Sequence, residues 1–241
     1  AFLYGESVFS TLRVEGGKAF FAQAHEARLN RGAQWLWGET PVSLKEKIAH
    51  TLSHPPQGEG VWRVSLHALS TRDQKLNDYQ VDSWWTEGLA AVVPLKLVSV
   101  FLAGRPLWWP SDVKTADYLQ RSMAAKHLDA GVLPLFVLEN QKICESLYAN
   151  VLFWDGAEWI FPRPSADVLD GIGQRKMQEV FQALHVPFKI REIFSIDLAQ
   201  FQSAFLINAV RGPMVIESID GRAYRAHPRY EELRREFFGR D

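Results

Sequence analysis

The chain has 241 residues, 47% of them hydrophobic and 23% charged, which suffices to bury one large core or two smaller ones. Its 27 Lys and Arg nearly balance its 28 Asp and Glu, so charge gives no argument for binding nucleic acid or an anionic membrane. The lone cysteine, Cys144, excludes an internal disulfide, and no apolar run is long enough to span a membrane. Because the first residues lack the pattern of a signal peptide, we expect a cytoplasmic protein.

The first part of the chain predicts a hairpin, two helices and two strands. Short apolar runs on either side of Glu15-Gly16-Gly17-Lys18 indicate the hairpin, within residues 8–21. Ser43 is expected to be the N-cap of the second helix. In residues 61–69 hydrophobic and polar side chains alternate, which puts Trp62, Val64, Leu66 and Ala68 on one face of a strand. The helices are expected over residues 23–37 and 43–52, and the second strand near residues 89–100.

The second half predicts a mixed order of helices and strands. Its expected elements are a helix over residues 118–130, strands over 134–139, 151–154 and 158–161, a helix over 174–184 and a strand over 204–207. Glycine and prolines mark residues 103–112 as a connection. The sequence therefore predicts a mixed α/β (α+β) fold with a small N-terminal α/β domain, residues 1–102, and a larger C-terminal domain, residues 113–241. A ligand site is expected between them.

Two residues have side chains suited to chemistry on an aldehyde. Lys114 lies directly before an expected helix, and a lysine that is held beside an aldehyde and partly desolvated forms an imine readily. Glu145 lies between two expected strands, and a carboxylate beside a pyridine nitrogen keeps that nitrogen protonated. Considered one at a time, a lysine in this position is more often a solvated surface residue, and a glutamate in this position is more often part of a turn.

Two further features could hold a phosphate group. Gly171-Ile172-Gly173 directly precedes an expected helix, where free backbone N–H groups and the helix dipole favour an anion. Arg28 lies on the first expected helix and could grip a phosphate with its guanidinium fork. An ordinary loop-to-helix junction and a surface arginine paired along its helix are the alternatives.

Six segments, taken in order along the chain, favour the functional interpretation of these residues over the structural one. They are residues 4–14 (YGESVFSTLRV), 25–29 (HEARL), 113–119 (VKTADYL), 145–151 (ESLYANV), 169–175 (LDGIGQR) and 205–212 (FLINAVRG). Together they resemble the motifs of the class IV aminotransferases, the fold-type IV enzymes that use pyridoxal 5'-phosphate (PLP). That family includes branched-chain aminotransferases, D-amino acid aminotransferases and 4-amino-4-deoxychorismate lyases. Because the chain opens inside the first motif and without Met, we expect that a leading segment is missing.

The resemblance implies a two-domain fold of the D-amino acid aminotransferase type with PLP between the domains. It also implies a homodimer whose active-site loops reach across the interface. Lys114 would be the catalytic lysine that forms the Schiff base, Glu145 would bind the pyridine nitrogen, and Leu169 would lie against the ring. The residues implied to hold the phosphate, the last four through nearby backbone N–H groups, are Arg28, Ile172, Gly173, Ala209 and Val210.

The substrate is expected to be a small amine or amino acid-like molecule, and no metal ligands are expected. Its carboxylates need cationic or N–H partners, for which Arg13, Arg63 and Arg211 are candidates, and Thr11 could donate a proton near the ring. Structural roles stay open for three of these residues: a solvent-facing position for Arg63, a backbone-bracing one for Arg211 and a satisfied strand hydroxyl for Thr11.

Within the family, residues 9–13 (FSTLR) and 208–212 (NAVRG) most resemble 4-amino-4-deoxychorismate lyase. That resemblance implies formation of 4-aminobenzoate, a folate precursor, and pyruvate. Residues 68–74, Tyr148, Gly173 and the position of Pro213 depart from the family's usual pattern. Two alternatives therefore stay open: an aminotransferase acting on D-amino or branched-chain amino acids, and a relative that binds PLP without turnover.

Overall fold

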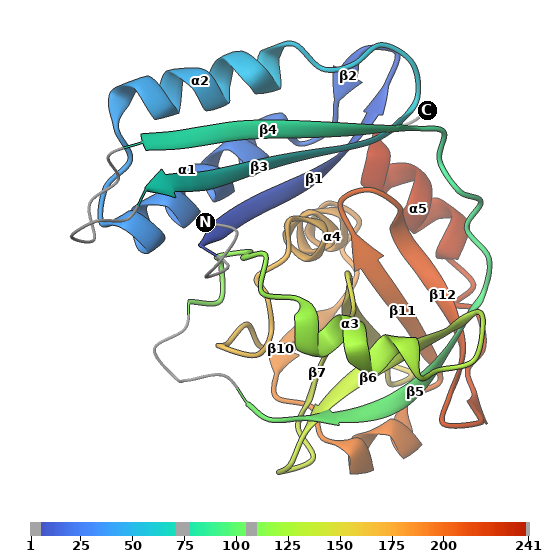
Figure 1. Ribbon diagram of the computed structural model, residues 1–241. Helices are drawn as coiled ribbons and strands as arrows, with labels where there is room; N and C mark the ends of the chain where they lie inside the picture. The colour runs from blue at the N-terminus through green and yellow to red at the C-terminus, as the bar shows by residue number, and fades with distance from the viewer. Residues whose placement is uncertain (1–5, 71–77, 105–109, 240–241) are drawn as a thin grey trace. The chain divides into compact units, whose positions relative to one another are not determined.

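The computed structural model describes residues 6–70, 78–104 and 110–239, and the chain divides into two compact units (Figure 1). The first unit comprises residues 1–90 and 112–118, and the second comprises residues 91–111 and 119–241. Both contain helices and strands, which confirms the predicted mixed α/β class. Within the described ranges, no helix has the length and apolar character needed to cross a membrane.

An antiparallel sheet with strand order β2-β1-β3-β4 forms the first unit. Its strands are β1 (Ser7–Glu15), β2 (Lys18–Ala19), β3 (Gly60–Ser70) and β4 (Asp78–Glu87). Gly16 and Gly17 both have positive φ in the turn from β1 to β2, which glycine adopts without steric penalty. The predicted hairpin is confirmed, whereas β4 was not predicted. Residues 4, 5 and 71–74, which the sequence motifs include, lie outside the described residues.

The core of the first unit lies between the sheet and two helices, α1 (Ala22–Trp37) and α2 (Val42–Ser53). The strand face predicted from the alternation in residues 61–69 is buried in this core, as expected. The predicted N-cap is wrong, because α2 begins after Pro41 and Ser43 lies inside the helix. The Ser43 hydroxyl instead accepts a hydrogen bond of 2.8 Å from the Tyr79 hydroxyl on β4.

The segment that carries Lys114 pairs with β1. The Phe9 amide donates to the Lys114 carbonyl at 3.0 Å, and the Ala116 amide donates to the Ser7 carbonyl at 2.9 Å. These bonds join residues 112–118 to the first unit, although the sequence-based boundary placed residue 113 onward in the C-terminal domain. Residues 91–102 belong to the second unit instead. The two paired segments are more than a hundred residues apart in the sequence, so their pairing produces no local periodicity from which it could be predicted.

Nine strands form the sheet of the second unit within its described residues, in the order β10-β9-β8-β11-β12-β5-β6-β7, with β13 beside β12. They are β5 (Leu95–Leu102), β6 (Val132–Leu138), β7 (Ile143–Ser146), β8 (Asn150–Trp154), β9 (Trp159–Pro162), β10 (Phe188–Arg191), β11 (Ser203–Asn208), β12 (Gly212–Ile219) and β13 (Arg222–Ala223). The helices are α3 (Leu119–Lys126), α4 (Ile172–Ala183) and α5 (Tyr230–Phe238), with a 3₁₀ helix at Ser195–Gln200.

Most predicted elements of this half are present, with shifted ends. The strand expected near residues 89–100 begins only at Leu95, and β7, β10, β12 and α5 were not predicted. The helical stripe in α4 is buried at Met177, Val180 and Phe181, where the helix packs on β11 and α5. This packing fixes the N-terminal end of α4 relative to the end of β11.

A buried polar pair connects α1 to β1 in the first unit. The Ser10 hydroxyl lies 2.6 Å from Nδ1 of His25, and both side chains are fully enclosed. Burial lowers the pKa of His25 to about 3, and the neighbouring charges of Arg28 and Lys114 act in the same direction. The imidazole is therefore neutral in the folded protein at neutral pH.

We expect His25 to make the first unit less stable as the pH falls. Its pKa of about 3 in the folded state lies below the ordinary value of 6.5, so the unfolded chain takes up a proton first. The contribution of His25 to the free energy of unfolding is present above pH 6.5 and falls by roughly 2 kcal/mol between pH 7 and pH 5. Urea unfolding of the wild type and His25→Gln at both pH values measures it. The exposed His50→Gln is the control, and an equal pH dependence in wild type and His25→Gln contradicts this account.

Candidate active site

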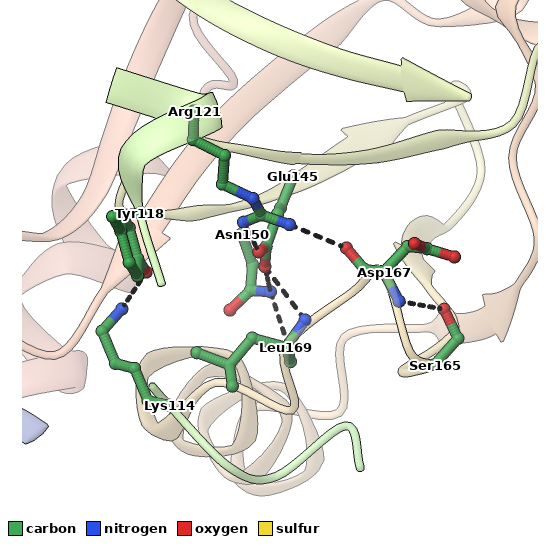
Figure 2. Close-up of polar contacts among 8 residues, drawn as sticks. All are labelled: Lys114, Tyr118, Arg121, Glu145, Asn150, Ser165, Asp167 and Leu169. Atoms are coloured by element: carbon green, nitrogen blue, oxygen red, sulfur yellow. Dashed lines mark hydrogen bonds and ion pairs between the residues drawn. The ribbon is translucent and has the colours of Figure 1, made fainter. Parts of the chain in front are cut away.

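The Lys114 side chain extends from the segment paired with β1 toward two aromatic rings. Its Nζ donates a hydrogen bond of 2.8 Å to the Tyr118 hydroxyl (Figure 2). The nitrogen also lies 5.1 Å from the ring centre of Phe9 and 5.2 Å from that of Tyr118. In the part of the chain that the structure describes, no carboxylate pairs with it. The amine is therefore half-buried and held in place without a counter-ion.

A second cation lies on the same sheet face as this lysine. The guanidinium carbon of Arg63 is 3.7 Å from the ring centre of Phe9, and Arg63 is directly opposite Thr11 in the β1–β3 register. Burial lowers the pKa of Arg63, while the nearby Tyr118 raises it. Thr11, half-buried, thus lies on the face that carries Phe9, Lys114 and Arg63. An anionic group bound there would meet two cations and a hydroxyl.

Arg28 and Arg13, also predicted from the sequence, are both buried in the first unit. Arg28 lies on α1, one turn after His25, whose pKa its charge lowers. Arg13 is engaged by an ion pair with Glu15, and its guanidinium is also 3.5 Å from a Glu59 oxygen. A role for Arg13 in substrate binding stays a prediction, and these carboxylates would compete with a substrate for it.

Glu145 is the centre of a buried polar network in the second unit. It lies inside β7, not between two strands as the sequence suggested. Its Oε1 forms an ion pair with Arg121, and its Oε2 accepts from the Leu169 amide at 3.0 Å and from Asn150 Nδ2 at 3.4 Å (Figure 2). Asn150 Nδ2 also donates to the Leu169 carbonyl at 2.7 Å. The carboxylate therefore has a fixed orientation, and Leu169 is fixed beside it.

Arg121 was missed by the sequence analysis. It lies on the short helix α3, whose sequence LQRSMAAK places Arg121 between two polar residues, so the local pattern does not indicate that its side chain is buried. Its side chain is 8% exposed, like that of Glu145. A carboxylate buried to this degree requires a cation or several donors, and that rule would have prompted a search for a partner of Glu145.

The start of α4 offers backbone donors for an anion. Gly171 is its N-cap and makes no side-chain capping bond, and the first helical hydrogen bond runs from the Arg175 amide to the Gly171 carbonyl. The amides of Ile172 and Gly173 therefore precede the helical ladder and point outward from its positive end.

The backbone after β11 closely approaches this helix start. A Cβ atom added at Gly173 would lie 2.6 Å from the Asn208 carbonyl carbon and 3.0 Å from the Ala209 amide nitrogen. The glycine that departs from the family's usual residue is thus required by the close approach of two backbone segments. The structure brings the start of α4 at Gly173 close to Ala209, and a phosphate site at these residues stays a prediction.

The backbone amides of residues 209–211 differ in whether they already donate a hydrogen bond within the turn. The Asn208 Oδ1 accepts from the Val210 amide at 3.0 Å and the Arg211 amide at 2.8 Å. The Ala209 amide has no such partner in the described part of the chain. Val210 would have to give up its bond to Asn208 in order to bind an anion, so Ala209 is the better placed donor of the two.

Helix α5 braces the other end of this turn. Arg234 Nη1 donates to the carbonyls of Arg211 at 2.8 Å and Pro213 at 3.0 Å. Gly212, with φ of +66°, packs so closely that an added Cβ would lie 2.8 Å from the Phe238 ring. The Arg211 backbone is therefore fixed, while its side chain is half-exposed and its substrate role stays a prediction.

These groups fit the chemistry of a phosphorylated pyridine aldehyde. The lysine amine suits the aldehyde, the Glu145 carboxylate suits a ring nitrogen, and the amides at the start of α4 suit the phosphate. Among the described residues, no group of three or more His, Cys, Asp and Glu side chains is arranged to hold a metal ion.

The family model for amino-transferases of class IV matches residues 7–219 of the chain. Of the curated proteins, none matches it. Among solved structures it resembles the 4-amino-4-deoxychorismate lyase from Pseudomonas aeruginosa, with a TM-score of 0.80, 19% identity and coverage of 97% of this chain and 90% of that one. It also resembles a fold IV-transaminase from Curtobacterium pusillum, with a TM-score of 0.84, 18% identity and coverage of 99% of this chain and 88% of that one. For an aminotransferase from Brucella abortus bound to PLP, the TM-score is 0.82 and the identity 18%, with coverage of 98% of this chain and 90% of that one.

The likeness to these structures shows the fold-type IV fold that the sequence predicted. Because the family model covers most of the sequence, the chain belongs to the amino-transferase class IV family, a family of PLP enzymes. The resemblance stated from the six motifs is thereby confirmed, together with the enzyme class.

We expect Gly173→Ala to weaken phosphate binding. The added methyl group would overlap the backbone at Asn208 and force apart the two segments that carry the converging amides. Affinity for PLP should fall at least about tenfold, while affinity for pyridoxal, which lacks the phosphate, changes much less. Spectroscopic titration measures both. Gly104→Ala is the matched control because its methyl group makes only ordinary contacts. Unchanged PLP affinity in Gly173→Ala would contradict the assignment.

We expect Tyr118→Phe to slow the reaction of Lys114 with aldehydes by about tenfold, because the ring stays in place while the acceptor for Nζ is lost. The rate of borohydride-trapped labelling of Lys114 by pyridoxal measures this effect across pH. Tyr79→Phe removes a comparable hydroxyl hydrogen bond elsewhere and serves as the control. Equal labelling rates in the two variants would show that the Tyr118 hydroxyl has no influence.

Proposed function

We propose that this chain binds PLP and converts 4-amino-4-deoxychorismate to 4-aminobenzoate and pyruvate, with Lys114 as the lysine that reacts with the cofactor aldehyde. The observation that carries the proposal is the state of the Lys114 amine. It is half-buried, bound to the Tyr118 hydroxyl and, among the described residues, paired with no carboxylate. An amine that is held in a fixed position and is engaged by no carboxylate is available to react with an aldehyde.

The choice of lyase within the family has support from three features. The first is the Phe9-Ser10-Thr11 segment, in which Ser10 stands where aminotransferases more often have glutamate. Because Ser10 contacts the buried His25, a carboxylate there would alter the charge beside Arg28. The second is the loop of residues 208–212, whose asparagine caps its own turn. The third is the similarity in fold to the lyase from Pseudomonas aeruginosa.

When bound, PLP would supply an electron sink for the carbon that carries the substrate amine. Glu145 would hold the proton at the ring nitrogen, and Leu169 would support one face of the ring. Arg28 and the amides of Ile172, Gly173 and Ala209 would hold the phosphate. Thr11, Arg63 and Arg211 are the groups proposed to meet the substrate's carboxylates and leaving group.

Lys114 would act as the base and acid of the reaction. Its amine takes the proton from the carbon next to the substrate nitrogen. The bond to the enolpyruvyl oxygen then breaks, and the leaving group takes up a proton and departs as pyruvate. The ring that remains is aromatic, which drives the step toward 4-aminobenzoate.

A second candidate is an aminotransferase acting on D-amino or branched-chain amino acids, which the similarity to the transaminase from Curtobacterium pusillum supports. In that reaction Lys114 would return the proton to the cofactor carbon and give a keto acid. A relative that binds PLP without turnover is a third candidate. It has no need of an unpaired lysine amine, so the state of Lys114 argues against it.

We further propose that the protein is a cytoplasmic homodimer that supplies a folate precursor, as the resemblance implies. Sedimentation with and without PLP tests the assembly. A monomer at micromolar concentration would remove the dimer from this proposal and leave the assignment of Lys114 in place.

We expect Lys114→Ala to lose the visible absorbance band of bound PLP and to reduce turnover at least about a thousandfold. The measurement is absorbance with PLP, followed by addition of 4-amino-4-deoxychorismate and of D- and L-amino acids. Joint appearance of pyruvate and 4-aminobenzoate supports the lyase, whereas conversion to the pyridoxamine form supports the aminotransferase. The exposed Lys45→Ala is the control, and residual full activity in Lys114→Ala would overturn the assignment.

A further inference from the structure

The contacts of Glu145 leave little of its carboxylate free. An ionised carboxylate has about four acceptor positions, two on each oxygen. The Leu169 amide and Asn150 Nδ2 use Oε2, and Arg121 uses one position on Oε1. Among the residues that the structure describes, these contacts leave one position on Oε1, beside the arginine cation.

Arg121 is itself held rigidly. Its Nη2 donates to the Asp167 carbonyl at 3.4 Å (Figure 2). Its guanidinium carbon lies 5.2 Å from the Phe136 ring centre. The neighbouring Cys144 adds no charge, because burial raises the pKa of its thiol to about 12. The pair of Arg121 and Glu145 is therefore the charge arrangement that a group bound at the free position of Oε1 would meet.

Since this arrangement does not depend on which reaction the enzyme performs, it extends the proposed function. We propose that Arg121 is a positioning residue that acts through Glu145 and keeps a shared proton on the ring nitrogen of PLP. The cation contacts Oε1 directly, and its attraction for the negative carboxylate is what would leave the shared proton to the ring nitrogen. Without it, a buried carboxylate would take the proton itself, and the ring would be a weaker electron sink.

The inference rests on PLP binding, so its test begins with the wild type loaded with ring-¹⁵N-labelled PLP. The nitrogen chemical shift should report a protonated ring nitrogen in the wild type and in Arg121→Lys, which keeps a cation. In Arg121→Gln it should move toward the unprotonated value. A protonated ring nitrogen in Arg121→Gln overturns the role of Arg121 and leaves the proposed function standing. A wild type that binds no PLP overturns both.

A second measurement separates this role from a merely structural one. The affinity for PLP should fall at least about tenfold in Arg121→Gln, while the affinity for the 1-deaza analogue, which lacks the ring nitrogen, should stay within about threefold. Equal losses for the two cofactors would show a structural role and overturn the proposal. Arg229→Gln removes a surface ion pair with Glu232 and is the matched control.

A buried carboxylate left alone could prevent Arg121→Gln from folding, so the double variant Arg121→Gln/Glu145→Gln removes both charges together. Compared with Glu145→Gln, it should show the same ring-nitrogen shift and the same PLP affinity, since Arg121 acts only through the carboxylate. A further tenfold loss in the double variant would mean that Arg121 contacts the cofactor by another route, and would overturn the proposal.

Discussion

Two backbone hydrogen bonds between β1 and residues 114–116 determine where the amine of Lys114 lies. They hold Lys114 at the register of Phe9, so its side chain emerges on the face opposite the helices that bury the other side of the sheet. Phe9 and Tyr118 then line the amine with aromatic rings and a hydroxyl. A slip of one residue in this pairing would turn Lys114 toward the core, so the role proposed for this lysine depends on the register more than on any single side-chain contact.

In the second unit, the burial of a charged side chain determines which groups must surround it. A carboxylate as enclosed as Glu145 is stable only with a cation and donors around it, and Arg121, Asn150 and the Leu169 amide provide them. The same bonds fix the loop at Leu169, which leads directly into the N-terminus of α4. Recognition of a ring nitrogen and of a phosphate would thus share one support, and a change at Glu145 should disturb both.

The sequence predicted what local patterns encode. Alternation over residues 61–69 identified the buried face of β3, and the six ordered motifs identified the family. It could not predict contacts made by long-range pairing, such as the transfer of the Lys114 segment to the first unit. It also missed Arg121, because the need for a cation is created by the burial of Glu145, which no pattern in α3 records. Gly173 looked like a departure and is explained only by the backbone of Asn208.

The distribution of charge among the described residues gives the strongest reason to regard the protein as a working enzyme. Arg13, Arg121 and Glu145 are buried, and each has an ion-pair partner that compensates for its loss of water. Lys114 is half-buried and has a hydroxyl where a carboxylate would serve stability better. A carboxylate beside it would form an ion pair with the amine and compete with an aldehyde for it. A protein selected for stability or for binding alone has no reason to avoid that carboxylate, whereas one that must attack an aldehyde does.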